Sequence, residues 1–344
     1  MAHVTLLERV KRAFARLLGR APLEPGRFVT GSKFSWSGWL GATPWAWPSR
    51  EYLVYVPRGY SRWKRRPMIV LLHGCRQTPE EIATGTRIAA LADRNGWLVL
   101  LPRQTEKANP WRCWNWFDAR TSAGDGETAV VLAQLREVRR TYRAHPRRVF
   151  VAGMSAGGAL AATLGMDSGQ TFAGVFVHSG IASGAASGPL AALDVMMHGA
   201  DTKYEAIAAA ARGRNPGSVV PLCAIHGGRD DVVAQINAIQ LVRQYLVRDG
   251  RLEPSEHPPA ELPPPDADTS REVGDGRTMK TTDYRVGDRV VVRLVRVAEL
   301  GHAWSGGDAS LSYNDAEPPD ATALLGEFII EQIRDQRKFG FGRT

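Results

Sequence analysis

The chain has 344 residues, 44% of them hydrophobic, which is enough for a substantial core in one large domain or two small ones. Its 44 Lys and Arg residues outnumber its 35 Asp and Glu residues, so the net charge is +9 and favours contact with anionic surfaces. Nucleic-acid binding is not expected, because the basic residues are spread out and no nucleic-acid motif occurs. The three cysteines are too few for a disulfide framework and lack the spacing of zinc ligands.

The N-terminal segment MAHVTLLERVKRAFARLLGR predicts a basic amphipathic helix. Its apolar residues recur at helical spacing, whereas Lys11, Arg12 and Arg16 fall on the other face. We expect this helix either to dock on its own domain or to bind a polymer-granule or membrane surface. The charges interrupt any signal-peptide core, so a cytoplasmic, granule-associated location is expected, with export by an unrecognised route as the alternative. No apolar run approaches the length of a membrane span.

Residues 21–49 are rich in Gly, Pro, Ser and Trp and predict an irregular lead-in, so 1–49 is treated as one N-terminal region. From residue 50, near-continuous apolar runs alternate with helical patterns, which is typical of a mostly parallel sheet with helices on both faces. The strands are expected at Tyr52–Pro57, Met68–His73, Trp97–Pro102, Arg148–Gly153, Gly174–His178 and Val219–His226. The helices are expected at about residues 80–95, 127–144, 156–167, 203–213 and 232–249. The sequence therefore predicts one α/β domain over 50–336 and a tail over 337–344.

A proline-rich stretch interrupts this alternation. Residues 254–265 read PSEHPPAELPPP, so an exposed loop is expected over about residues 251–280. Beyond it, Tyr284–Val286 and Arg289–Val297 predict two β segments around a Gly-Asp turn.

The stretch Gly153-Met154-Ser155-Ala156-Gly157 is the only G-x-S-x-G motif in the chain. It follows the strand-like run RVFVA and opens the helical run ALAATLGM, as a nucleophile elbow requires. In such an elbow the serine occupies a sharp turn, and small neighbours let the backbone crowd around it. The alternative is a small-residue turn that only packs a helix on the sheet.

A serine nucleophile needs a histidine base and a carboxylate that orients the base. In hydrolases with this elbow, the acid and then the histidine follow the serine along the chain. Asp230 and Asp231 directly follow the strand PLCAIH, and one of them is expected to cap the next helix instead. His302, in LGHAW, follows the β segment VVVRLVRVAE. We therefore predict a triad of Ser155, one of these aspartates and His302.

The oxyanion of acyl transfer needs two preorganised N–H donors. One is expected from the backbone of Ala156, directly after the nucleophile. The other comes from a loop that follows an early strand and carries a His-Gly sequence, and IVLLHGC places this donor at the backbone of Cys75. The remaining histidines at strand ends, His73, His178 and His226, are expected to pack or to bond to the backbone.

With these motifs in order, the chain resembles the PHB depolymerase-type esterases of the α/β-hydrolase superfamily, and most of all poly(3-hydroxybutyrate) depolymerases without a signal peptide. The stretches that carry the resemblance are LLHGCRQTPEE, CWNWFD, GDGETAVV, RVFVAGMSAGGALAA, FAGVFVHSG, HGGRDDVV and LGHAWSGG. The resemblance implies an α/β-hydrolase fold, with Ser155 as nucleophile, His302 as base and Asp230, rather than Asp231, as acid. No cofactor and no metal are expected.

The family includes feruloyl and acetylxylan-type esterases as well as polyester depolymerases, so the resemblance specifies the reaction and leaves the substrate open. Because the chain shows no signal peptide and no C-terminal substrate-binding module, we expect it to act on poly(3-hydroxybutyrate) or related short-chain hydroxyalkanoate polyesters inside the cell. The alternatives are a feruloyl or acetylxylan-type carbohydrate esterase, a small-ester hydrolase, and a non-catalytic granule-binding protein.

Four tryptophans, Trp111, Trp114, Trp116 and Trp304, are candidates to line an apolar acyl cleft, with core packing as the alternative. Of these we expect Trp304, beside the base, and Trp116 to contact substrate.

Cys75 is expected to matter through its backbone N–H rather than through its thiol. No elbow and no metal-binding constellation surrounds it in the sequence, so the thiol is expected to be a packing group. A bridge to Cys113, the only other cysteine near the predicted site, is the alternative.

Overall fold

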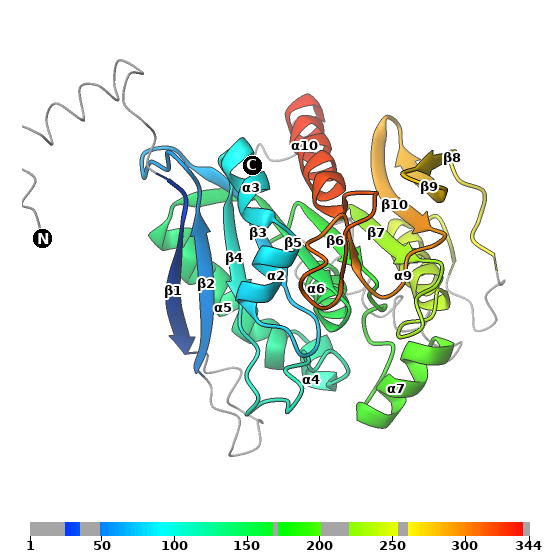
Figure 1. The fold of residues 1–344 in the computed structure, drawn as a ribbon, viewed down its shortest axis with the longest axis horizontal. Coiled ribbons are helices and arrows are strands. Elements are labelled where there is room, and N and C mark those ends of the chain that lie inside the picture. The colour runs from blue at the N-terminus through cyan, green and yellow to red at the C-terminus, as the bar shows by residue number, and fades with distance from the viewer. Residues whose placement is uncertain (1–24, 35–48, 168–170, 201–219, 254–260, 340–344) are drawn as a thin grey trace, which may run out of the picture.

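A computed structural model describes residues 25–34, 49–167, 171–200, 220–253 and 261–339. Within these ranges, ten strands form one sheet in the order β1-β2-β4-β3-β5-β6-β7-β10-β9-β8, with helices on both faces (Figure 1). The predicted N-terminal helix and the helix expected at 203–213 lie outside the described residues. None of the helices in the described ranges is both long and apolar enough to cross a membrane.

The central strands are parallel and buried on both faces. They are β3 (Arg66–Leu72), β4 (Leu98–Pro102), β5 (Ala144–Met154), β6 (Gly174–His178), β7 (Leu222–Gly227) and β10 (Arg289–Val297). Their side chains alternate between the two faces, as strand geometry requires. Along β3, Val70 and Leu72 face one core cluster, whereas Ile69 and Leu71 face the other. This is why the central strands read as continuous apolar runs in the sequence.

Antiparallel strands extend the sheet at both ends, in two segments where the sequence had indicated irregular structure. At one end, β1 (Arg27–Phe34) pairs with β2 (Ser49–Val56), so part of the predicted lead-in is a strand. At the other end, β8 (Ala267–Val273) and β9 (Arg277–Val286) pair next to β10, so the second half of the predicted proline-rich loop is a hairpin. Most side chains of β8 are exposed, which leaves no apolar alternation for a sequence pattern to detect.

Helices bury apolar stripes against each face of the sheet. On one face lie α5 (Gly126–Thr141), α6 (Ala156–Asp167) and α9 (Ile236–Asp249), and on the other lie α2 (Pro79–Gly85), α3 (Ile88–Asn95) and α10 (Ala321–Phe339). Short elements complete the described fold: α4 (Ala119–Ser122), α7 (Pro189–His198), β11 (Trp304–Ser305) and β12 (Asn314–Asp315).

Several helix boundaries differ from the sequence-based expectation. The helix expected at 127–144 ends at Thr141, because β5 begins at Ala144. The helix expected at 80–95 is interrupted at Arg87, whose φ of 53° breaks the helical backbone between α2 and α3. The helix expected from residue 232 begins at Ile236. The last helix, α10, is not among the helices expected from the sequence, and it extends to Phe339, beyond the predicted domain end at residue 336.

Candidate active site

Ser155 lies on the turn between β5 and α6, and its φ of 54° is a left-handed conformation that non-glycine residues rarely adopt. The backbone is crowded around this turn. A Cβ on Gly157 would lie 2.3 Å from the Leu72 carbonyl oxygen, and a Cβ on Gly153 would lie 2.2 Å from that of Gly157. The Ser155 N–H donates to the His178 carbonyl at 2.9 Å, which ties the turn to β6. The G-x-S-x-G spacing therefore folds into a sharp strand-to-helix turn, because only glycine fits at both flanking positions.

Asp230 and His302 come together from loops that follow the parallel strands β7 and β10. His302 Nδ1 lies 3.0 and 2.9 Å from the two carboxylate oxygens of Asp230, whose Oδ1 also accepts from the N–H groups of Val232 and Val233. Burial raises the pKa of Asp230, but the hydrogen bond with His302 and the backbone N–H donors outweigh it and lower the pKa to about 2. The ionised carboxylate therefore favours the Nδ1–H tautomer of His302, with Nε2 as proton acceptor. Asp231 is exposed and makes no such contact in the described structure.

Two buried histidines flank this carboxylate–imidazole pair. His226 Nε2 lies 2.8 Å from the Val233 carbonyl and 3.7 Å from Asp230 Oδ2. The ring of His178 stacks on Trp304 with 5.2 Å between centroids. Burial lowers the pKa of both, to about 3 for His178, so each is neutral at pH 7. His226 therefore bonds to the backbone and His178 packs against Trp304, as the sequence predicts for histidines at strand ends.

Ser155 and His302 line the same cavity, whose volume is about 320 Å³. Most of its other lining residues are apolar or aromatic, and they include Trp111, Cys75, Met154, Met196, Val232 and Tyr313. The cavity therefore brings together a hydroxyl on a strained turn, an imidazole oriented by a carboxylate, and apolar walls that suit the acyl part of an ester.

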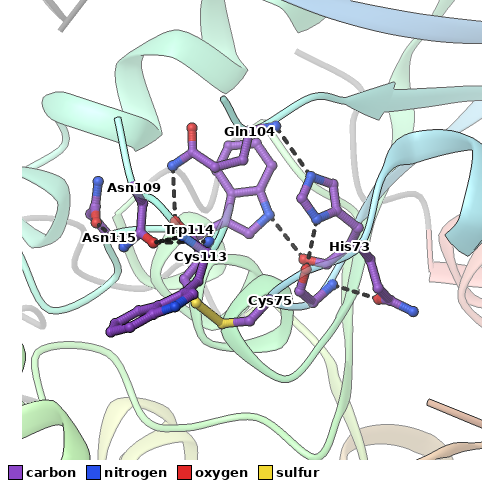
Figure 2. The surroundings of a disulfide bond; sticks show 10 residues. His73, Cys75, Gln104, Asn109, Cys113, Trp114 and Asn115 are labelled. Atoms are coloured by element: carbon purple, nitrogen blue, oxygen red, sulfur yellow. Dashed lines mark hydrogen bonds between the residues drawn. A yellow bond between two sulfur atoms is a disulfide. The ribbon is translucent and has the colours of Figure 1, made fainter. Parts of the chain in front are cut away.

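Two backbone N–H groups, that of Cys75, which lines the cavity, and that of Ala156, which follows Ser155, donate to no protein acceptor among the described residues. Ala156 is the first residue of α6, so its N–H has no partner within the helix. The Cys75 N–H belongs to the same peptide unit as the Gly74 carbonyl, which lies 2.8 Å from His73 Nδ1. His73 Nε2 accepts from the Gln104 N–H at 3.1 Å, so its Nδ1 carries the proton that Gly74 accepts (Figure 2). Burial lowers the pKa of His73 to about 4, which keeps this ring neutral at pH 7.

A disulfide joins Cys75 to Cys113, 38 residues further along the chain (Figure 2). The prediction that the Cys75 thiol is only a packing group is therefore wrong, and the alternative bridge is present. The Trp114 Nε1–H donates to the His73 carbonyl at 3.0 Å and ties the same two loops a second time. The loop with the Cys75 N–H is thus crosslinked to the loop that contributes Trp111 to the cavity.

Both tryptophans predicted to contact substrate are buried elsewhere. Trp304 is 1% exposed, and its Nε1–H donates to Thr322 Oγ1 at 3.0 Å. Trp116 is 4% exposed and packs edge-on against Phe117 in the core. Trp111, which is 63% exposed, lines the cavity instead. One sequence signal for this difference is that Trp111 lies in a polar loop, NPWR.

Tyr313 also lies at the cavity and was not foreseen. Its ring contacts the His302 ring edge-on, with 6.5 Å between centroids, and its φ is 63°. No local pattern marks this residue, because its contact with His302 depends on the path of the loop between β11 and β12.

Comparison with known proteins identifies relatives among esterases. Residues 50–257, more than half of the chain, match the sequence profile of the family described as esterase PHB depolymerase. Poly(3-hydroxyalkanoate) depolymerase C of Paucimonas lemoignei is 30% identical over 200 residues, which cover 57% of this chain and 47% of that protein. Feruloyl esterase B of Thermothelomyces thermophilus is 28% identical over 138 residues, which cover 40% of this chain and 46% of that protein. The chain thus spans less than half the length of these two relatives.

An acetyl xylan esterase from Aspergillus awamori has the same fold as this chain. The TM-score is 0.61 at 16% sequence identity, and the superposition covers 91% of this chain and 100% of that one. The likeness confirms the predicted α/β-hydrolase fold.

Proposed function

The chain belongs to the PHB depolymerase esterase family, and from that premise we propose that it is a serine esterase whose triad is Ser155, His302 and Asp230. One observation carries the proposal: His302, bonded through Nδ1 to Asp230, lines the same cavity as Ser155. This arrangement has the nucleophile, base and orienting acid that ester hydrolysis through an acyl-enzyme requires.

In the proposed reaction, His302 Nε2 takes the hydroxyl proton of Ser155 as Oγ attacks the ester carbonyl carbon. The imidazolium then protonates the leaving alkoxide as the tetrahedral intermediate collapses, which leaves an acyl-serine. In the second half, His302 deprotonates a water molecule, the water attacks the acyl carbon, and the proton returns to Ser155 Oγ as the acid leaves. Asp230 holds the tautomer and stabilises the imidazolium in both halves.

The oxyanion of each tetrahedral intermediate is proposed to accept from the N–H groups of Cys75 and Ala156. Two features support this role: neither group has a protein acceptor among the described residues, and both belong to residues held by the rigid elements around the cavity. The hydrogen bond from His73 to the Gly74 carbonyl orients the Cys75 peptide unit before substrate arrives.

For the substrate, we propose poly(3-hydroxybutyrate) or a related short-chain hydroxyalkanoate polyester. The apolar cavity supports this choice, and so does a row of exposed apolar side chains on α7, the helix that contributes Met196 to the cavity. Leu190, Leu193 and Met197 are 84%, 60% and 63% exposed and are spaced to share one face of this helix. An insoluble apolar polymer can cover such a face while one chain enters the cavity. Feruloyl esters are the second candidate, because Trp111 and Tyr313 offer two aromatic rings at the cavity.

Hydrolysis of a short-chain p-nitrophenyl ester by the wild type and by Ser155→Ala tests the mechanism. We expect the variant to lose turnover by roughly 10⁴-fold or more with its fold intact by circular dichroism. Equal turnover by both proteins would overturn the enzyme proposal in favour of a non-catalytic granule-binding protein.

A comparison of amorphous poly(3-hydroxybutyrate) granules, crystalline polymer and methyl ferulate tests the substrate. Hydroxybutyrate oligomers released from amorphous granules, with little ferulate released, support the polyester proposal. Release of ferulate alone would replace it with the carbohydrate-esterase alternative.

Deletion of residues 1–20, followed by granule co-sedimentation, tests the predicted adsorption by the N-terminal helix; unchanged binding would refute that prediction.

We also propose that the protein works in an oxidising compartment, which corresponds to the exported alternative rather than to the cytoplasmic location first expected. The Cys75–Cys113 disulfide supports this, because cytoplasmic thiols are generally kept reduced. Alkylation of free thiols in freshly lysed cells, followed by mass spectrometry, tests it. One alkylated cysteine, Cys223, is expected; three alkylated cysteines would favour the cytoplasm.

A further inference from the structure

A second hollow, of about 500 Å³, lies at the other end of the parallel strands and has arginine side chains around it. Its lining includes Arg65, Arg136, Arg139, Arg140 and Arg143. These residues come from the β2–β3 loop, the last turns of α5 and the link to β5, and both β3 and β5 begin at this edge of the sheet. The catalytic cavity is lined by residues that follow the other ends of the same strands, so the two hollows lie at opposite ends of these parallel strands.

Most of this positive charge has no acidic partner. Arg140 pairs with Glu137 at 3.2 Å, and the same carboxylate oxygen also binds Lys33 at 3.1 Å. Arg139 donates to the Pro146 carbonyl, which brings no charge. Within the part of the chain that the structure describes, five further cations of this region take part in no ion pair with a carboxylate: Arg62, Lys64, Arg65, Arg136 and Arg143. A cluster of like charges at such density attracts anions.

An exposed tryptophan stands among these cations. Trp63, in the β2–β3 loop, is 83% exposed, and the Arg62 guanidinium lies 5.8 Å from its ring centroid. Lys64 and Arg65, both exposed, follow it directly in the chain. An amphipathic indole ring surrounded by basic side chains is the composition that proteins use at the level of lipid headgroups. We call Arg62, Trp63, Lys64 and Arg65, together with Arg136, Arg139, Arg140 and Arg143, the basic edge.

We propose that the basic edge binds the surface of an anionic phospholipid bilayer, with headgroup phosphates among the arginines and the Trp63 ring at the interface. Guanidinium groups pair with phosphate through two parallel N–H donors, and a hollow with five of them can seat a headgroup. Single-stranded nucleic acid fits less well, because its sites present successive aromatic rings along a groove, whereas the basic edge has the single ring of Trp63.

This orientation leaves the catalytic cavity facing away from the bilayer. A membrane-bound molecule would therefore keep its cavity and the apolar face of α7 open to a substrate in the adjacent space. Binding at the basic edge requires neither Ser155 nor any other residue of the cavity, so it stands or falls separately from the esterase proposal.

Vesicle co-sedimentation of the full chain tests the proposal. The vesicles contain phosphatidylcholine alone or with roughly 30% phosphatidylglycerol, a composition that gives a negative surface potential. The test variant is Arg136→Gln/Arg140→Gln/Arg143→Gln, which removes three exposed cations from the basic edge. The matched control is Arg271→Gln/Lys280→Gln/Arg296→Gln, which removes three cations from β8, β9 and β10 at the far end of the sheet. Both variants keep the N-terminal segment and carry the same net charge, and circular dichroism reports that each is folded whether or not the chain hydrolyses esters.

We expect binding only to the anionic vesicles, with release in roughly 0.5 M NaCl, where screening shortens the range of surface charges. The test variant should lose roughly a hundredfold in partition coefficient, from about fivefold for each cation at the surface, and the control should lose much less. In vesicles with brominated acyl chains, wild-type fluorescence should be quenched more strongly than that of Trp63→Ala.

Three results would overturn the proposal. The first is equal binding by the test variant and the wild type, and the second is an equal loss in both triple variants, which would reflect net charge alone. The third is arginine-dependent binding of a soluble polyphosphate or oligonucleotide without binding to vesicles, which would assign the basic edge to another class of polyanion.

Discussion

The two edges of the parallel strands are built from different chemistry. At the carboxyl-terminal edge, Ser155, Asp230 and His302 are buried or nearly so, hydrogen-bonded and surrounded by neutral histidines. At the amino-terminal edge, exposed arginines such as Arg136 and Arg143 lack acidic partners. The difference follows from the two tasks. Covalent chemistry needs atoms held within fractions of an ångström in a dry cavity, whereas a charged surface needs only a density of like charges.

The largest expected effect is at the carboxyl-terminal edge. Asp230→Asn should lower kcat for a soluble ester by roughly 10⁴-fold, because an amide no longer favours the Nδ1–H tautomer of His302 or stabilises its cation. Asp231→Asn, at an exposed neighbouring position, is the matched control and should stay within a few-fold of the wild type. Equal losses of kcat in the two variants would contradict the assignment of Asp230 as the acid of the triad. Vesicle binding should be the same in both, since neither residue belongs to the basic edge.

The second effect concerns the crosslink beside the cavity. Cys75→Ser/Cys113→Ser should lower the free energy of unfolding by about 3–4 kcal/mol, because the bridge restrains an unfolded-state loop between residues 38 positions apart. Urea denaturation measures this change. The variant's kcat for a soluble ester should fall, because the bridge holds the loop with the Cys75 N–H. Its partition coefficient for anionic vesicles should change less, because the bridge lies far from the basic edge. If kcat and stability stay at wild-type values, the crosslink does not position this loop.

The third effect is a dependence of stability on pH that comes from the carboxyl-terminal edge. Burial lowers the pKa of His73 to about 4 and of His178 to about 3, and it also lowers the pKa of His226. These folded-state values lie below the unfolded value of about 6.5, so the unfolded chain binds more protons below that pH. The stability that these neutral histidines contribute is fully present above pH 6.5. It is lost progressively as the pH falls below 6.5 toward their folded-state pKa values.

Each of these histidines should add up to about 1.4 kcal/mol per pH unit to the loss of unfolding free energy. Urea denaturation at pH 7, 6 and 5 measures the slope, and His178→Phe should make it shallower. A flat profile between pH 6.5 and 4.5 would show that the histidines are not held neutral. The arginines of the basic edge keep their charge over this range. Burial and the nearby arginines lower the pKa of His145, which lies beside them, so vesicle binding at pH 6 should stay close to that at pH 7.

The smallest expected effect comes from removing one tryptophan at each edge, Trp111 at the cavity and Trp63 at the basic edge. Trp111→Ala should raise KM for an ester with a long acyl group by about fivefold, through loss of roughly 1 kcal/mol of apolar contact at the cavity, with little change in kcat. Trp63→Ala should leave that KM unchanged and weaken vesicle binding instead. The opposite pattern, or equal effects of the two variants in both assays, would contradict the assignment of the two tryptophans to different surfaces.

The sequence predicted the central strands and the turn around Ser155 because both are local. Continuous apolar runs identify strands buried on both faces, and glycine at positions 153 and 157 is needed to fit the backbone of one sharp turn. It did not predict β8, whose side chains are mostly exposed and carry no apolar period. It also misplaced Trp304, because sequence adjacency to His302 says nothing about which side of the chain a ring occupies. In the structure, the bond to Thr322 Oγ1 holds that ring in the core.

The amino-acid sequence by itself determined the α/β class, the order of the central strands along the chain, the elbow geometry at Ser155 and the family. The first three depend on a periodicity or a short motif whose physical requirement is met within a few neighbouring residues, and the family depends on several such motifs in order along the chain. Only the tertiary structure decided that Cys75 bonds to Cys113, that Trp111 rather than Trp304 or Trp116 lines the cavity, and that Arg65 joins the arginines of α5 around one hollow. These features bring together residues far apart in the chain, so they depend on how loops leave a shared sheet edge, and no local pattern encodes that distance.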